Sequence, residues 1–333
     1  MYQTLKKLLQ NTPSVSGREG GIRDLIASLM RPLVDEITVD AMGNLICLKK
    51  GTAGTPKRVL LAAHMDEIGF IVNYIEDSGY LRVAPIGGID YVAAADSLVV
   101  FENGTKGVLV PEGDLKRGEA PKAEKCYIDI GAKSHRDAEK RVKIGDTCAL
   151  AAGLTRLCGS RVCGRPLDDR VGCAVLVEIA SRLSAPADDV YYVFSVQEEV
   201  GCRGAGPAAF GIAPDVALIF DVTGTGDTLS ASPMAVKLGD GVAVKIKDKS
   251  VICDASLVEE LLLLAKSKGI AVQCEILTYG GTDASAVQMT GLGCKTGALS
   301  LPCRYIHTGV EMLDMNDVKA AADLAIAYLG GEK

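Results

Sequence analysis

The sequence predicts an α/β protein with a mainly parallel sheet, helices on both faces of that sheet, and a small β-rich domain inserted into it. Helical and strand patterns alternate in the first 67 residues and again after residue 155, as is typical of such sheets. The segment between them contains only short apolar or alternating runs separated by Gly, Pro, Asp and Asn. We therefore expect residues 1–67 and 156–333 to form one domain, and residues 68–155 to form the insertion.

The expected elements follow from the spacing of apolar residues along the chain. The first part offers an apolar repeat of helical spacing ending near Leu33, an alternating pair at 36–49 and a short apolar run at 59–63. In the insertion, strands are expected at residues 70–75, 80–83, 97–101, 107–110, 126–130 and 147–150. After residue 155 we expect a helix at 176–183, strands at 190–196 and 217–220, a helix at 257–268, strands near Val272 and Thr296, and a helix at 318–325.

The composition fits a chain with a sizeable core and excludes several classes of function. Of the 333 residues, 48% are hydrophobic and 23% are charged. The formal net charge is -6 and no stripe of basic residues could neutralise phosphates, so we expect no nucleic acid partner. No apolar run reaches transmembrane length, so we expect no membrane partner. The eleven cysteines lack the paired spacing of zinc fingers and indicate reduced thiols in the cytoplasm.

Residues of the types that bind metals follow three of the apolar runs. They are His64 and Asp66 after 59–63, Glu198 and Glu199 after 190–196, and Asp221 after 217–220. Two further candidates stand at element boundaries, the pair Asp168-Asp169 and His307. Because ligands of open α/β sheets bind beyond the carboxyl ends of the strands, we expect these side chains to converge on one crevice.

Such a crevice would hold at least four carboxylates and two imidazoles, with few basic side chains beside them. Crowded carboxylates repel one another and raise one another's pKa values unless positive charge compensates. Two divalent metal ions would supply that charge. Imidazole and carboxylate ligands suit zinc or a similar first-row ion, and two such ions can share an activated water.

Each of these signals also has a simpler structural interpretation. A histidine after a strand is commonly a core or edge residue, and an Asp-Asp pair before a helix commonly caps that helix. Adjacent glutamates commonly mark a solvated strand end. The joint placement of the signals at strand ends favours a functional site over these separate interpretations.

Five ordered motifs extend over most of the chain, at residues 62–70 (AAHMDEIGF), 167–172 (LDDRVG), 196–201 (VQEEVG), 280–284 (GGTDA) and 304–307 (RYIH). With these motifs the sequence resembles the glutamyl aminopeptidase family of dinuclear metallopeptidases. This is the group of the tetrahedral aminopeptidases, and some of its members are labelled endoglucanase M. The resemblance implies a phosphorylase/hydrolase-like peptidase domain interrupted by a PDZ-like dimerisation domain at residues 68–155.

The resemblance also assigns roles to the candidate residues. The implied metal ligands are His64 and Asp221 for one ion, Glu199 and His307 for the other, and Asp168 as the bridge. Glu198 is the implied general base, which takes a proton from the attacking water and returns it to the leaving amine. Asp66 would hydrogen-bond the far nitrogen of His64 and so fix its orientation.

The implied protein is a cytoplasmic metallo-aminopeptidase that removes amino-terminal residues from short peptides. It would carry two divalent ions per subunit, zinc or cobalt being favoured and manganese compatible, and would form dimers that assemble into a dodecamer. A related metallohydrolase acting on acylated amino acids, a glycosidase and an inactive metal-bound scaffold are the alternatives. The metal-ligand histidines argue against a glycosidase, and the presence of Glu198 argues against a scaffold. The preferred amino-terminal side chain and the native metal stay open.

Overall fold

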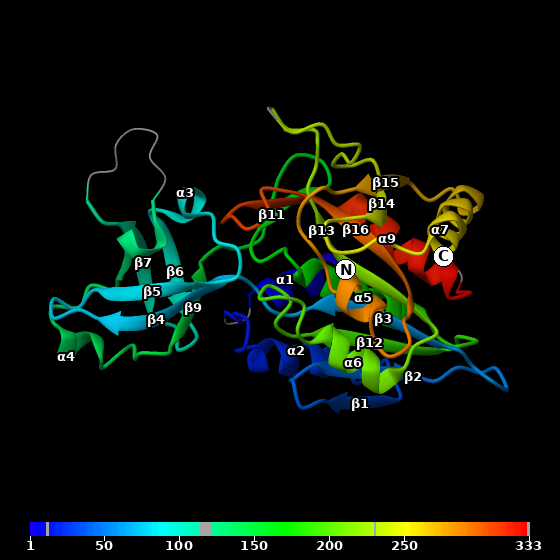
Figure 1. Ribbon diagram of the computed structural model, residues 1–333, viewed down its shortest axis with the longest axis horizontal. Coiled ribbons are helices and arrows are strands. Elements are labelled where there is room, and N and C mark those ends of the chain that lie inside the picture. Colours follow the sequence, from blue (N-terminus) through cyan, green and yellow to red (C-terminus); the bar gives the residue numbers. More distant parts are fainter. Residues whose placement is uncertain (11–12, 114–120, 230, 332–333) are drawn as a thin grey trace.

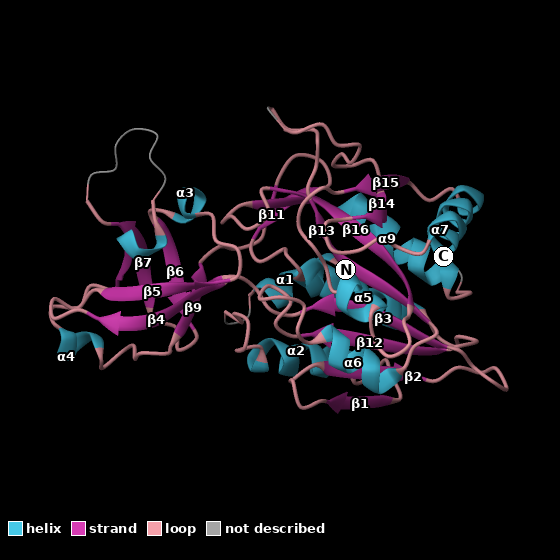
Figure 2. Cartoon of the chain, viewed as in Figure 1, coloured by secondary structure: helices cyan, strands magenta, loops and turns pink. Residues whose placement is uncertain are grey.

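The chain forms a large mixed sheet covered by helices and a separate closed barrel (Figure 1). The computed structural model describes residues 1–10, 13–113, 121–229 and 231–331. Figure 2 shows the barrel strands standing apart from the helices and strands of the large sheet. This arrangement agrees with an α/β fold that contains a β-rich insertion.

The large sheet has eleven strands. Its main path runs through β1 (Glu36–Val39), β2 (Leu45–Lys49), β12 (Asp189–Ser195), β3 (Arg58–His64), β13 (Val216–Thr223), β16 (Lys295–Arg304), β17 (Glu311–Asp314), β11 (Arg161–Gly164) and β10 (Thr155–Arg156). Two further strands, β14 (Val242–Lys247) and β15 (Val272–Ile276), extend from β16. The sequence predicted β12, β3, β13, β15 and β16, but it gave no indication of β10, β11, β14 or β17.

The prediction of a mainly parallel sheet is correct for the centre and for the outlying pair β14–β15. Strands β12, β3, β13 and β16 are parallel to their neighbours in this group. The flanking pairs β1–β2, β2–β12, β14–β16, β16–β17, β11–β17 and β10–β11 are antiparallel. The central strands read as continuous apolar runs because both of their faces are buried, whereas the short flanking strands carry no such signal.

The parallel register brings the candidate site residues to one edge of the sheet. His64 ends β3 and lies opposite Ser195, the last residue of β12. Asp221 in β13 lies opposite Ser300 in β16. The loop that follows β12 carries Glu198 and therefore starts beside His64.

The helices of the large domain pack in two groups against the sheet. The helices are α1 (Tyr2–Leu9), α2 (Gly20–Met30), α5 (Arg170–Arg182), α6 (Ala205–Ile212), α7 (Ala255–Lys268), α8 (Ala284–Gln288) and α9 (Met315–Tyr328). Helix α5 contacts α1, α2, α9, β3 and β13, whereas α6 and α8 contact each other. Asp169 caps the N-terminus of α5, because its side chain accepts a hydrogen bond from the backbone N–H of Gly172. Among the described residues, no helix is both long and apolar enough to cross a membrane.

The insertion forms a closed barrel with its own core. Its strands are β4 (Gly69–Ile75), β5 (Leu81–Ile86), β8 (Cys126–Asp129), β7 (Lys106–Pro111), β6 (Ser97–Phe101) and β9 (Thr147–Leu150), in barrel order. All pairings in the barrel are antiparallel. Short helices lie at Tyr91–Ala94 (α3) and His135–Ala138 (α4).

The alternating pattern of the insertion was sufficient to predict its strands. All six predicted strands are present, because alternation places Phe70, Leu81, Phe101 and Ile128 in one separate hydrophobic cluster. The predicted border after residue 155 falls inside β10, which pairs with the large sheet.

Candidate metal centre

A cleft with a volume of about 640 Å³ opens at the carboxyl edge of the parallel strands. The predicted ligands and the predicted base all line it, namely His64, Asp168, Glu198, Glu199, Asp221 and His307. These residues come from five separate stretches of the chain, between 64 and 307. The parallel register explains the meeting of β3, β13 and the loop after β12, and the loops before α5 and after β16 complete the cluster.

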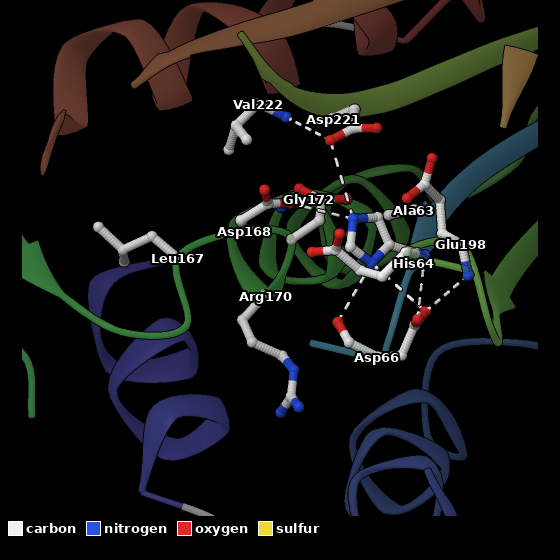
Figure 3. A network of polar contacts seen from close by, with 12 residues as sticks. Ala63, His64, Asp66, Leu167, Asp168, Arg170, Gly172, Glu198, Asp221 and Val222 are labelled. Atoms are coloured by element: carbon white, nitrogen blue, oxygen red, sulfur yellow. Dashed lines mark hydrogen bonds and ion pairs between the residues drawn. The ribbon is translucent and has the colours of Figure 1, made fainter. Parts of the chain in front are cut away.

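One group of possible ligands surrounds His64 (Figure 3). The Nε2 atom of His64 lies 3.0 Å from Oδ1 of Asp168 and 3.8 Å from Oδ1 of Asp221. The side chain of His64 is 2% exposed and those of the two carboxylates are at most 9% exposed. All three ligand atoms lie within 4.8 Å of one another, so a single cation could contact all of them.

A second group shares Asp168 with the first. The Nε2 atom of His307 lies 3.2 Å from Oδ2 of Asp168 and 3.2 Å from Oε1 of Glu199. The two carboxylate oxygens of Asp168 therefore face different histidines, Oδ1 toward His64 and Oδ2 toward His307. This is the arrangement required of a carboxylate that bridges two cations.

The charges of the cluster are out of balance. Burial raises the pKa values of Asp221 and Glu198 well above the ordinary carboxyl value, and neighbouring carboxylates raise them further. Burial also raises the pKa of Glu199. Against the effect of burial, hydrogen bonds to Asp168 raise the pKa values of both histidines, that of His307 to about 11.

The excess of carboxylates over basic groups shows whether these side chains suit metal ions. Among the described residues, the basic groups within 4.0 Å of the carboxylates of Asp168, Glu199 and Asp221 are the two imidazoles. Divalent ions would replace the protons of the imidazoles and compensate the carboxylates, so metal binding would release protons. Imidazole nitrogen and carboxylate oxygen are donors that zinc, cobalt and manganese accept. The residues therefore fit two divalent ions.

Asp66 connects the end of β3 to the loop that carries both glutamates. The Nδ1 atom of His64 lies 3.2 Å from the backbone carbonyl oxygen of Asp66 and 3.5 Å from its carboxylate. That carboxylate accepts hydrogen bonds from the backbone N–H groups of Glu198 and Glu199, at 3.0 and 3.2 Å. The hydroxyl of Ser16 donates to it as well. Asp66 therefore contacts His64 at Nδ1, mainly through its backbone carbonyl oxygen, and its carboxylate holds the loop of both glutamates.

Glu198 lies beside the two groups rather than between them. Its Oε1 atom accepts a hydrogen bond from the thiol of Cys202 at 3.2 Å, and both residues line the cleft. With Asp283 they form a third set of closely spaced donor atoms. Asp283 belongs to the motif at 280–284, in which no role for this residue was assigned from the sequence. Its Oδ2 accepts a hydrogen bond from Ser195, at the end of β12.

Two supporting contacts were missed at the sequence level. The fully buried carboxylate of Glu311 accepts hydrogen bonds from the backbone N–H groups of Asp168 and His307, and it pairs with Arg165. It therefore fixes the two loops that supply these possible ligands. No pattern around Glu311 indicated this, because Arg165 and Asp168 are distant from it in sequence.

The second missed contact comes from the barrel. The Nδ1 atom of His307 lies 3.0 Å from the backbone carbonyl oxygen of Gly88, which follows β5. A Cβ at the neighbouring Gly87 would lie 3.3 Å from the Cβ of Glu199. The barrel segment after β5 therefore reaches the cluster of candidate ligands and contacts one of its histidines.

Backbone strain is concentrated around the same residues. Four residues other than glycine have positive φ angles beside the cluster, namely Gln197 (57°), Cys202 (52°), Tyr305 (60°) and His307 (64°). Each such conformation costs on the order of 1–3 kcal/mol and persists only where the surroundings hold it. Strain of this kind is typical of functional sites.

Comparisons with known proteins agree with this geometry. The model of the M42 glutamyl aminopeptidase family matches residues 43–324. A protein of Acetivibrio thermocellus is 44% identical over 326 residues, which cover 98% of this chain and 97% of that protein. The structure of an aminopeptidase from the archaeon Desulfurococcus kamchatkensis superposes with a TM-score of 0.95 at 36% identity, covering 98% of this chain and 93% of that one.

A further structural relative is described as forming closed shells. The TET1 peptidase of Pyrococcus horikoshii superposes with a TM-score of 0.89 at 35% identity, and the match covers 98% of both chains. That peptidase can assemble into a tetrahedron or a large octahedral shell.

Proposed function

This chain belongs to the M42 glutamyl aminopeptidase family and is an aminopeptidase, and from that premise we propose that it works with two divalent metal ions on short peptides. The observation that carries this proposal is the position of Asp168, whose two carboxylate oxygens each contact a different histidine. A carboxylate shared in this way suits a pair of cations and is hard to explain in a site for one.

We infer that His64 and Asp221 hold one ion, that Glu199 and His307 hold the other, and that Asp168 bridges them. Zinc or cobalt suits these ligands best, and manganese is compatible. When bound, such ions polarise the scissile carbonyl group and lower the pKa of a water to about 7.

Glu198 is the proposed general base. Its carboxylate lines the cleft next to both ligand groups, and burial raises its pKa, which favours accepting a proton. It would take the proton of the attacking water and return it to the nitrogen of the leaving group. Asp66 would not touch the substrate, and its role would be to hold His64 and the backbone of Glu198 in place.

The finer points of architecture and location are also proposals. We propose that residues 68–155 form a PDZ-like dimerisation domain within a peptidase domain at 1–67 and 156–333, and that helices cover both faces of the sheet. The separate packing of α5 with α9 and of α6 with α8 supports the second point. We also propose a cytoplasmic location and a homo-oligomer of dimers assembled into a dodecamer, and the likeness to the shell-forming TET1 peptidase supports the assembly.

The test is the hydrolysis of amino-terminal amino-acid anilides by metal-stripped protein resupplied with zinc, cobalt or manganese. Activity should return with metal, and Glu198→Gln should lower kcat by about 100- to 10,000-fold, as expected for loss of a general base. The variant should still bind two metal ions. Glu260→Gln, on the exposed face of α7, is the matched control and should retain activity. Full activity in Glu198→Gln, or activity without metal, would contradict the proposal.

A further inference from the structure

The cleft wall away from the metal centre is almost free of charge. Beyond the proposed ligands and Glu198, the lining includes the apolar side chains of Leu277, Tyr279 and Ile306 and the hydroxyl groups of Thr225 and Ser250. Among the described residues that line the cleft, Arg304 is the one further side chain with a formal charge.

The charge of Arg304 is cancelled by Asp227. The guanidinium group donates from Nε to Oδ1 of Asp227 at 3.0 Å and from Nη2 to Oδ2 at 2.6 Å. Paired hydrogen bonds of this kind between Arg and a carboxylate are both strong and orientationally specific. Oδ2 of Asp227 also accepts a hydrogen bond from the backbone N–H of Leu238, and both side chains of the pair are 15% exposed. Neither charge is therefore free to meet a substrate.

A buried cation behind this wall, Lys245, is also paired with carboxylates. Lys245 is fully buried, does not line the cleft, and is paired with the buried carboxylate of Glu275. That carboxylate accepts a hydrogen bond from the hydroxyl of Thr223, a residue of the cleft wall. Lys245 therefore supports the wall from within, and its ammonium group does not line the cleft.

We propose that the cleft accepts an uncharged amino-terminal side chain, and that the Arg304–Asp227 ion pair maintains this preference by keeping the wall neutral. The inference rests on the proposed function, because it concerns the substrate of the same site. A charged side chain that enters this wall loses its water and finds no opposite charge, so its binding is penalised. An uncharged side chain loses less hydration free energy on entering the cleft, and it contacts the apolar side chains of Leu277 and Ile306.

The proposal predicts opposite effects from breaking the pair on either side. In Asp227→Asn the guanidinium group loses its counter-charge, so the wall becomes positive. Substrates with an acidic amino-terminal side chain should then have a higher kcat/KM. In Arg304→Gln the carboxylate of Asp227 loses its partner, so substrates with a basic amino-terminal side chain should have a higher kcat/KM. In the double variant with both substitutions the wall is neutral again, and the preference for uncharged side chains should return.

The experiment compares kcat/KM for leucine, glutamate and lysine p-nitroanilides in the full, metal-loaded chain. For the natural sequence, the leucine substrate should exceed both charged substrates by at least about tenfold, the lower end of what single contacts discriminate. Asp227→Asn should raise the glutamate-to-leucine ratio and Arg304→Gln the lysine-to-leucine ratio, chiefly through KM. Circular dichroism and the restored preference of the double variant would separate these effects from misfolding.

Three outcomes would overturn the inference. The first two leave the proposed function in place, and the third does not. Highest activity of the natural sequence on the glutamate or lysine substrate, or equal changes for all three substrates in both single variants, would overturn it while leaving the aminopeptidase proposal in place. Inactivity on all three substrates with every metal would overturn the proposed function as well.

Discussion

Replacing Gly87 with alanine should disturb both the fold and the metal centre. Gly87 lies in the barrel segment after β5, where its φ angle is +76°. A Cβ added there would lie 2.5 Å from Cγ2 of Ile68 and 3.3 Å from the Cβ of Glu199. Its neighbour Gly88 contacts Nδ1 of His307 through its carbonyl oxygen. The substitution therefore combines a strained backbone with a clash beside two proposed ligands.

The magnitude follows from these two contributions. A left-handed conformation costs a residue other than glycine about 1–2 kcal/mol, and overpacking of a filled site costs about 1–3 kcal/mol. Gly87→Ala should therefore lower the free energy of unfolding by about 2–5 kcal/mol. Gly113 is a matched control, because its φ angle is also +76° and an added Cβ would meet none of the described residues within 4 Å. Gly113→Ala should show only the backbone cost, about 1–2 kcal/mol.

Urea unfolding of the metal-loaded proteins, followed by circular dichroism, measures this difference. Gly87→Ala should lose at least about 1 kcal/mol more than Gly113→Ala, and only Gly87→Ala should bind metal more weakly. Equal losses of stability in the two variants would refute the role given to the clash. Unchanged metal affinity in Gly87→Ala would refute the coupling between the barrel segment and the centre.

Three further predictions concern charge and metal. Against the effect of burial, the hydrogen bonds of Arg304 lower the pKa of Asp227 to about 2, below its value of about 3.9 in an unfolded chain. The stabilisation from this pair is therefore complete above about pH 4 and is lost as the pH falls through about 2, so Arg304→Gln should cost more unfolding free energy at about pH 6 than at about pH 3. Lys245→Met leaves the buried carboxylate of Glu275 unpaired and should cost about 3–5 kcal/mol in urea unfolding. The matched change at the exposed Lys125 should cost at most about 1 kcal/mol, and equal costs would contradict the account. Chelation should lower Tm, because the ions bind the folded chain, and an unchanged Tm would argue against a metal centre.

The parts of the site that lie at strand ends could be predicted from the sequence. His64 and Asp221 belong to strands buried on both faces, and each directly follows the continuous apolar run of its strand, although β13 extends two residues beyond Asp221. The convergence of their side chains then follows from the geometry of parallel strands. The barrel strands could also be predicted from the sequence, because short apolar or alternating runs separated by turn residues are typical of strands.

The remaining parts depend on contacts between distant segments. Glu311 supports the loops of Asp168 and His307 from the short strand β17, which has no distinctive pattern of its own. The contact between Gly88 and His307 depends on where the barrel sits beside the sheet, and local sequence does not encode that position. The flanking strands β10, β11, β14 and β17 escaped prediction for the same reason, since pairing partners are set by tertiary packing.

The central claim is that this chain catalyses peptide hydrolysis with two metal ions bridged by Asp168. The most direct test is a titration of the metal-stripped protein with zinc, with activity and bound metal per chain measured at each step. The account predicts that activity rises until two equivalents are bound and then stays constant. Full activity at one equivalent, or in the stripped protein, would contradict it.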